Sequence, residues 1–416
     1  MATRKKLIVV GTLAVGVLAI ALALVLSTDF ASPKLGKAAL EQASKATGMK
    51  LSAAGFRLNL LRGLTLEEVE AFWRFPGGRL EARIDEILFE HRLVPLLSGK
   101  VVIERVVVRR PSLKLVEARD RPASQKNSNR RRDQSPEPQR RRDPTPVEAQ
   151  RLVLEISELR LEDGAYSSAG KGGGSFPSVR GVDCLLHNID IQTGALTLLH
   201  GLSADGELHV KEIALESSLV QGFAARLEAS GGGLALDDLS LTTRGSPFLG
   251  SMTWDFNTIP FKYTLRLKGG PLDVDTLTGS SGSPGGFGAA FLELEAEGFG
   301  SDSRNIKGKG KLRLESGTLP PIPVLSLLEE ALGRSGLVGS AYRETDLAFR
   351  LEKNHLLLEP FQLEAGNVGF ELGGSVDFDG PLDLRVVLQS EQGQIAAPFR
   401  VSGTMEEPVV RYDREK

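Results

Sequence analysis

The stretch that decides the fold is FQLEAGNVGFELGGSVDFD, residues 361–379. Its apolar side chains follow a period of two, first on Phe361 and Leu363 and then, on the other parity, from Val368 to Phe378. Successive side chains of a β-strand point to opposite faces of the sheet, so this period predicts strands with one apolar and one polar face. The stretch contains no reactive side chain, which points away from catalysis.

Composition supports a large β protein. The chain has 416 residues, 41% hydrophobic and 25% charged, enough for one large or two ordinary domains with a core. Its 46 glycines favour many strands joined by turns. The 51 basic and 53 acidic residues nearly cancel, so the net charge gives no general attraction for nucleic acid or for an acidic membrane. Cys184 is the only cysteine, which excludes an internal disulfide, and we expect it to act as a small buried apolar residue.

Residues 7–26, LIVVGTLAVGVLAIALALVL, carry no charge. A helix of this length spans about 30 Å, the thickness of a bilayer core. Arg4, Lys5 and Lys6 precede it, so the positive-inside rule predicts a cytoplasmic tail at residues 1–6, a single-pass signal anchor, and the rest of the chain outside the cytoplasm. A cleaved signal peptide is the alternative, but its apolar region is usually about 7 to 15 residues long.

The exported part is predicted to have four regions. Residues 33–118 begin with an amphipathic helix at 33–48 and continue as strands, including two strands on either side of Pro111. Residues 119–148 are rich in Arg and Pro and have almost no large apolar side chain, so we expect a disordered linker. A middle β region, 149–300, follows it. The last region, 301–416, is β with one apolar helix at 324–333.

Several strands of the middle and last regions alternate especially clearly, and together they predict an apolar face. The stretches 250–256 and 374–388 also resemble each other, which indicates a repeated hairpin unit. The candidate residues of the apolar face are Met252, Trp254, Phe256, Tyr263, Leu265, Leu267, Leu292, Leu294, Leu347, Phe349, Leu351, Phe361, Leu363, Phe370, Leu372, Val376 and Phe378.

A search for catalytic and metal-binding patterns points to neither. The five histidines are scattered, and His209 with Glu212 lies in a predicted strand that would turn the two side chains to opposite faces. The acid pair Asp237 and Asp238 and the pair Asp273 and Asp275 have turn-like neighbours. No phosphate-binding loop, nucleophile elbow or calcium loop occurs in the sequence. We therefore expect no enzyme activity, metal or cofactor, although two acids facing a cleft would permit glycoside hydrolysis.

The order of several motifs resembles the AsmA family of bacterial envelope proteins, which are relatives of TamB-like and chorein-type lipid-transfer proteins. Near the N-terminus the likeness is carried by KATGMKLSAAGFRLNLLRGLTLEEVE (45–70), RLVPLLSGKVVIERVVVRRPSLKL (92–115) and ISELRLEDGAY (156–166). Near the C-terminus it is carried by GKLRLESGTLPPIPVLSLLE (310–329), YRETDLAFRLEKNHLLLEPFQLEAGNVGFELGGSVDF (342–378) and FRVSGTMEEPVV (399–410). The linker at 119–148 departs from the family's pattern.

The resemblance implies an elongated, curved antiparallel sheet with a taco-like apolar groove. It implies an inner-membrane protein, N-terminus cytoplasmic and bulk periplasmic, that binds or conducts phospholipid acyl chains for outer-membrane assembly and lipid homeostasis. The partners it implies are the membrane, phospholipid and other envelope proteins, and no nucleic acid.

Two alternatives stay open from the sequence. A non-enzymatic structural adaptor for outer-membrane protein assembly would use exposed sheet edges. The alternating face could also close on itself as an ordinary sandwich or barrel core, because both arrangements need the same binary pattern.

Overall fold

The computed structural model describes most of the chain after residue 48. The described residues are 44, 49–59, 63–75, 78–91, 103–117, 153–169, 175–192, 198–215, 218–274, 287–300, 302–332, 336–377, 380–390, 395–404 and 407–413. The predicted anchor at 7–26, the linker at 119–148 and all of the predicted helix at 33–48 except Ser44 therefore lie outside the described residues.

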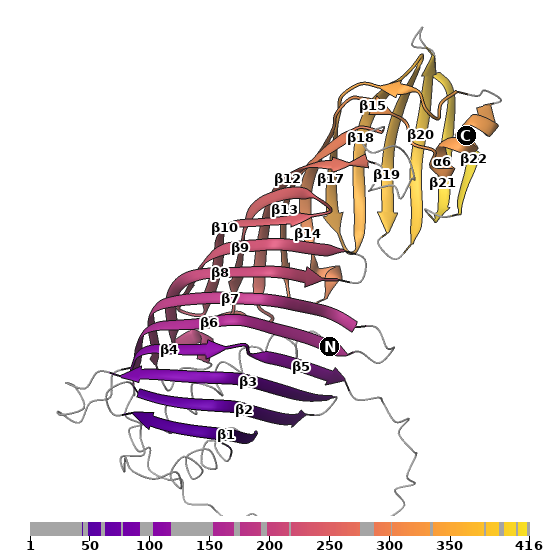
Figure 1. The fold of residues 1–416 in the computed structure, drawn as a ribbon. Coiled ribbons are helices and arrows are strands. Elements are labelled where there is room, and N and C mark those ends of the chain that lie inside the picture. The colour runs from indigo at the N-terminus through magenta and orange to yellow at the C-terminus, as the bar shows by residue number, and fades with distance from the viewer. Residues whose placement is uncertain are drawn as a thin grey trace, which may run out of the picture. The chain divides into compact units, whose positions relative to one another are not determined.

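The chain divides into an N-terminal unit that ends at Ala204 and a C-terminal unit that begins at Asp205. The strands of each unit lie side by side in Figure 1. The elements of the N-terminal unit are β1 (Lys50–Asn59), β2 (Gly63–Phe75), β3 (Gly78–His91), β4 (Ile103–Arg109), β5 (Ser112–Glu117), β6 (Val153–Ala169), β7 (Ser175–Gln192) and α4 (Leu198–Gly201). Strand β8 (Leu202–Ala214) begins at the boundary.

In the N-terminal unit, β4 and β5 are two halves of one interrupted strand. Both pair antiparallel with β3, and Pro111, which has no N–H for the ladder, lies between them, as the sequence predicted. Both halves run parallel to β6. The antiparallel sheet that the sequence predicted is therefore interrupted at this place by parallel pairings. The physical reason is the connection through residues 118–152, because a parallel pair requires a crossover of at least about a dozen residues.

The C-terminal unit is antiparallel throughout its described pairings. Its elements after β8 are β9 (Leu219–Ser230), β10 (Gly233–Thr243), β11 (Ser246–Asp255), β12 (Lys262–Asp273), β13 (Ala289–Phe299), η1 (Ser303–Asn305), β14 (Lys307–Leu314), β15 (Gly317–Thr318), α6 (Pro323–Leu332), β16 (Ala341–Tyr342), β17 (Thr345–Glu352), β18 (His355–Ala365), β19 (Val368–Asp377), β20 (Pro381–Ser390), β21 (Ile395–Thr404) and β22 (Pro408–Tyr412). Strands β9 to β14 pair in chain order, β14 pairs with β17, and β17 to β22 again pair in chain order.

Helix α6 interrupts the chain order between β14 and β17. The sequence predicted a helix at 324–333, and the structure has one at Pro323–Leu332, with Gly333 outside the described residues. The short strands β15 and β16 flank the helix and pair with each other. Figure 1 shows α6 beside β21 and β22 at one end of the C-terminal unit.

Each unit has its own buried apolar clusters. In the N-terminal unit one cluster includes Leu66, Ile87, Val106 and Ile156 from β2, β3, β4 and β6. In the C-terminal unit the largest joins α6 to β19, β20 and β21. The strands of both units are thus apolar on one side, as the period of two predicts.

Candidate functional site

Strand register in the C-terminal unit brings its apolar side chains to one face, which we call the apolar face. Trp254 lies opposite Tyr263, and Met252 opposite Leu265. The same row continues from β12 through β13 and β14 to β17 and β18, where Leu351 lies opposite Leu356. Residues that lie opposite each other on neighbouring strands point to the same face of the sheet, so one face is apolar from β10 to β21.

A β-bulge keeps this face continuous where the parity changes within β18. The register shifts between Leu358 and Phe361, so Leu358 lies opposite Gly374 while Phe361 lies opposite Leu372. The extra residue of a bulge returns the side chains of the bulged strand to the same face. All the predicted candidates except Phe256 and Phe378 are therefore on the apolar face. Phe256 lies in the β11–β12 turn, and Phe378 is outside the described residues.

The opposite side of the same strands, which we call the charged face, carries ion pairs between neighbouring strands. Lys268 Nζ lies 2.5 Å from Glu293 Oε1, and Lys311 Nζ lies 2.6 Å from Asp346 Oδ2. The hydrogen bond from Lys268 holds the pKa of the Glu293 carboxyl below its ordinary value. These side chains are exposed, so the pairs add little stability. They establish that the charged face is the solvated one.

The apolar face is not covered evenly. On β11, β12, β13, β14 and β17 most of its side chains are partly exposed, and on β12, β13 and β14 they alternate mainly with exposed charged residues. We call this part the open section. Its partly exposed side chains include Met252, Trp254, Tyr263, Leu265, Leu267, Leu292, Leu294, Leu312, Leu347 and Leu351. In an ordinary two-layer β protein these positions would be buried.

On β20 and β21, and at Phe370 on β19, the apolar face is buried, and we call this part the covered section. Val386 and Val401 are fully buried, and Val324 and Leu328 of α6 belong to the same cluster. Phe370 is only 3% exposed within this cluster. The expectation that Phe370 lines an open surface is therefore wrong, because α6 lies over this end of the face.

Leu363, Leu372 and Val376 pack against the same cluster, so only part of their surface stays free. They share the apolar face with Phe361, which is also partly exposed. The predicted candidates thus fall into two groups. Those from β11 to β17 lie on the open section, although Phe349 is itself buried there, with its ring over Gly310. Those from β18 and β19 lie at or under the helix-covered end.

Aromatic rings on the apolar face lean over glycines of the neighbouring strand. Phe349 lies opposite Gly310, and a Cβ added to Gly310 would overlap the Phe349 ring. In the same way, the ring of Phe248 lies over Gly269 and the ring of Tyr263 lies over Gly298. A ring that lies along the sheet covers the backbone without needing a second layer. Sequence reasoning missed these glycines, although KGKGKLRL (307–314) keeps the period of two with glycine at apolar positions.

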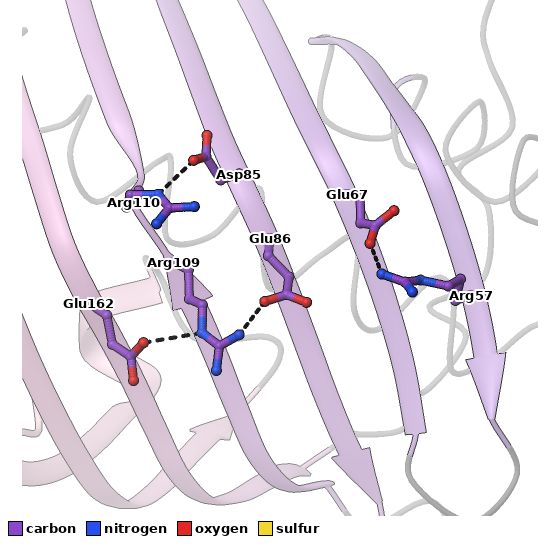
Figure 2. Close-up of polar contacts among 7 residues, drawn as sticks. All are labelled: Arg57, Glu67, Asp85, Glu86, Arg109, Arg110 and Glu162. Carbon is purple, nitrogen blue, oxygen red and sulfur yellow. Dashed lines mark hydrogen bonds and ion pairs between the residues drawn. The ribbon is translucent and has the colours of Figure 1, made fainter.

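In the N-terminal unit the polar face holds Arg105 and Arg109 of β4 between two carboxylates each, as Figure 2 shows for Arg109. Arg109 pairs with Glu86 on β3 and with Glu162 on β6, at 3.2 Å for the second pair. The hydrogen bond to Glu86 is the main cause that raises the pKa of Arg109. Arg110 Nε lies 2.7 Å from Asp85 Oδ2. These contacts link β4, which runs parallel to β6, to its antiparallel neighbour β3. The arginines are therefore neutralised by carboxylates of the protein itself.

Two of the residues considered for chemistry, Cys184 and Asp238, have surroundings that account for them without a reactive role, and Asp275 lies outside the described residues. Cys184 lies opposite Leu161, and burial raises the pKa of its thiol to about 11, so the thiol stays protonated at neutral pH. Asp238 is paired with Arg226 at 3.0 Å. Within the described ranges, no three His, Cys, Asp or Glu side chains are arranged to hold a metal ion. The absence of an enzyme activity, a metal and a cofactor remains a prediction.

Comparisons with known proteins do not identify the chain. No family model, curated protein or solved structure matches the chain. Among the helices that the structure describes, none is long and apolar enough to cross a membrane, and residues 7–26 lie outside them.

Proposed function

We propose that this chain is an AsmA-like envelope-biogenesis protein that binds or conducts phospholipid acyl chains along the apolar face of its C-terminal unit. The observation that carries the proposal is the open section. Its apolar side chains are partly exposed, while the other side of the same strands is charged and solvated. In a single layer of strands with this pattern, only the apolar side has to be shielded from water.

Exposed apolar area costs about 25 cal/mol per Å², which favours an apolar ligand over water on this face. Acyl chains suit it, because each buried methylene contributes about 0.8 kcal/mol and requires no hydrogen bond or charge from the protein. The lack of reactive groups on the open section is what such a ligand requires. Rings that lie over Gly310 and Gly298 give the ligand a smooth apolar surface.

The proposed location is the inner membrane, with residues 1–6 in the cytoplasm, residues 7–26 as a single anchor and the two units in the periplasm. The support is the charge pattern around the apolar run and the AsmA-like order of motifs. The motif at 92–115 includes β4 and most of β5, and the motif at 156–166 lies within β6. In this proposal the protein is not an enzyme, uses no cofactor and binds no nucleic acid. Its partners are phospholipid, the membrane and other envelope proteins.

Native mass spectrometry of the gently purified full chain tests the proposal. We expect bound phospholipid in the wild type and a large loss of it in Leu265→Asn, which puts an amide on the open section. The matched control is Leu249→Asn, on the neighbouring strand but on the charged face, where Leu249 is 64% exposed. A folded wild type without lipid, or an equal loss in both variants, would contradict the proposal.

A second candidate function is that of a structural adaptor in outer-membrane protein assembly. Val409 and Tyr412 are exposed large apolar side chains on β22, for which β21 is the one described partner strand. Such an edge can accept a strand from another protein. Cross-linking from position 409 to a protein partner, with no lipid bound to the wild type, would favour the adaptor.

A further inference from the structure

The loop between β11 and β12 presents an isolated apolar tip. Its residues, FNTIPF at 256–261, carry no charge. Ile259 is 91% exposed, more than any other large hydrophobic side chain in the described ranges. Phe299, at the end of β13 opposite Lys262, is also exposed. An isoleucine this exposed contributes almost nothing to folding, so its side chain is free for a contact outside the chain.

The loop is held in place by hydrogen bonds to the β9–β10 turn, to the end of β13 and within itself. The backbone N–H of Phe256 donates to Gly232 O at 2.9 Å, and the side-chain Nδ2 of Asn257 donates to Gly231 O at 2.8 Å. The hydroxyl of Thr258 donates to Pro260 O at 3.1 Å. Gly300 N donates to Phe261 O at 2.8 Å, which ties the loop to the end of β13. Ile259 is thus presented outward by a fixed frame.

The tip is continuous with the open section. The ring of Phe256 lies 5.7 Å from that of Phe261, and Phe261 lies 6.3 Å from Tyr263. Tyr263 lies opposite Trp254 on the apolar face. A row of aromatic rings therefore leads from the exposed tip to the face on which the proposed function places acyl chains.

We propose that this loop is the point at which the C-terminal unit enters a phospholipid bilayer, and that the aromatic row is the path of an acyl chain between the bilayer and the open section. The proposal rests on the proposed function. A bilayer is the occupant that fits, because the side chains of Asn257 and Thr258 already donate hydrogen bonds, to Gly231 O and to Pro260 O, and the six residues of the loop are uncharged. A protein partner would need directional polar contacts around the apolar tip.

The small apolar area of the tip determines how strongly it binds a membrane. Two exposed apolar side chains such as Ile259 and Phe299 bind a membrane only weakly and reversibly. A stable contact requires a second membrane-binding element in the same chain. The predicted anchor at 7–26 supplies that element by keeping the chain near a membrane. A tip that binds weakly, in a chain that is also anchored, can enter and leave the bilayer repeatedly.

Fluorescence quenching in vesicles tests the contact. The full chain carries Cys184→Ala, so that Ile259→Cys or Leu249→Cys provides one site for an environment-sensitive label. It is reconstituted into phosphatidylethanolamine and phosphatidylglycerol vesicles with brominated acyl chains. We expect the label at 259 to be quenched severalfold and the label at 249, exposed on the charged face, to stay unquenched.

The outcomes separate this inference from the proposed function. If the wild type carries lipid but the label at 259 is not quenched, or if 259 cross-links to a protein, the bilayer contact is refuted and the open section still binds lipid. If 259 is quenched although native mass spectrometry finds no bound lipid, the contact stands and the proposed function fails. Ile259→Ser should slow lipid exchange with vesicles severalfold and leave the amount of bound lipid unchanged.

Discussion

The open section and the covered section of the C-terminal unit have the same alternating pattern and different surroundings. In the open section Leu265, Leu294 and Leu347 are partly exposed. In the covered section Val386 and Val401 are fully buried beneath the layer that includes α6. The comparison teaches that the strands themselves do not decide whether an apolar face is closed. A short covering layer, formed by the helix Pro323–Leu332 together with Leu319 and Leu337, makes the difference.

The largest effect is expected where the helix meets the sheet. Leu328→Ala removes a fully buried side chain, so it should lower the free energy of unfolding by about 2–5 kcal/mol. Leu265→Ala, in the open section, should cost about 1 kcal/mol, because its side chain is already partly exposed. Urea unfolding followed by Trp254 fluorescence, in a Trp73→Phe background, measures both. Equal losses would mean that the two sections are packed alike.

A smaller effect is expected at the rings that cover the open section. Gly310→Ala places a Cβ against the Phe349 ring and the backbone of β13, which should destabilise the unit by about 1–3 kcal/mol. Gly369→Ala is the control, because its added Cβ would meet only Gln389 at 3.6 Å, an ordinary contact. The same urea titration compares them. If Gly310→Ala is as well tolerated as Gly369→Ala, the ring does not lie over the glycine.

Acid should loosen the covered section. The Glu329 carboxylate of α6 accepts the backbone N–H groups of Gly336, at 2.7 Å, and of Leu337 and Val338. These hydrogen bonds, with that from Val338 first, lower the Glu329 pKa below its ordinary value of 4.5. A lowered pKa in the folded state gives stability that is present above the unfolded pKa and is lost as the pH falls through the folded one.

Glu329→Gln should therefore be less stable than the wild type at neutral pH, and the two should converge below about pH 4. Amide hydrogen exchange of α6 across this range is the measurement. A difference between the two proteins that stays constant down to pH 3 would show that the charge of Glu329 does not hold the 336–338 segment.

The smallest effect is expected on the charged face. Lys268→Gln removes the ion pair with Glu293, and both side chains are mainly exposed. We expect no measurable change in urea unfolding at physiological salt, because solvent and ions screen such pairs. A clear loss of stability would indicate that the charged face is covered in the folded protein, and the contrast between the two faces would then need revision.

Local patterns in the sequence predicted the local structure. The period of two identified the strands and the residues that share a face, Pro111 marked the break between β4 and β5, and the apolar run at 324–333 marked α6. Pairing between distant segments could not be read this way. The parallel pairing with β6 depends on where the chain returns after residue 117, which no local period encodes.

The sequence also could not show which part of the apolar face is open and which part is covered. An open face and a face beneath a helix need the same alternation, so Phe370 and Leu265 look alike until α6 is placed. The bulge in β18 also changes parity without changing face. The exposure of Ile259 depends on the hairpin that presents it, although the uncharged run at 256–261 was visible.

The rings that lean over Gly269, Gly298 and Gly310 have a consequence for motion. Rings lying along the sheet leave few ridges, and neighbouring strands repeat about every 4.8 Å. A hydrocarbon tail on such a surface would meet much the same environment at each step, so no single position would trap it. Such a surface favours sliding over tight capture, and friction, more than affinity, would then set the rate at which a lipid travels.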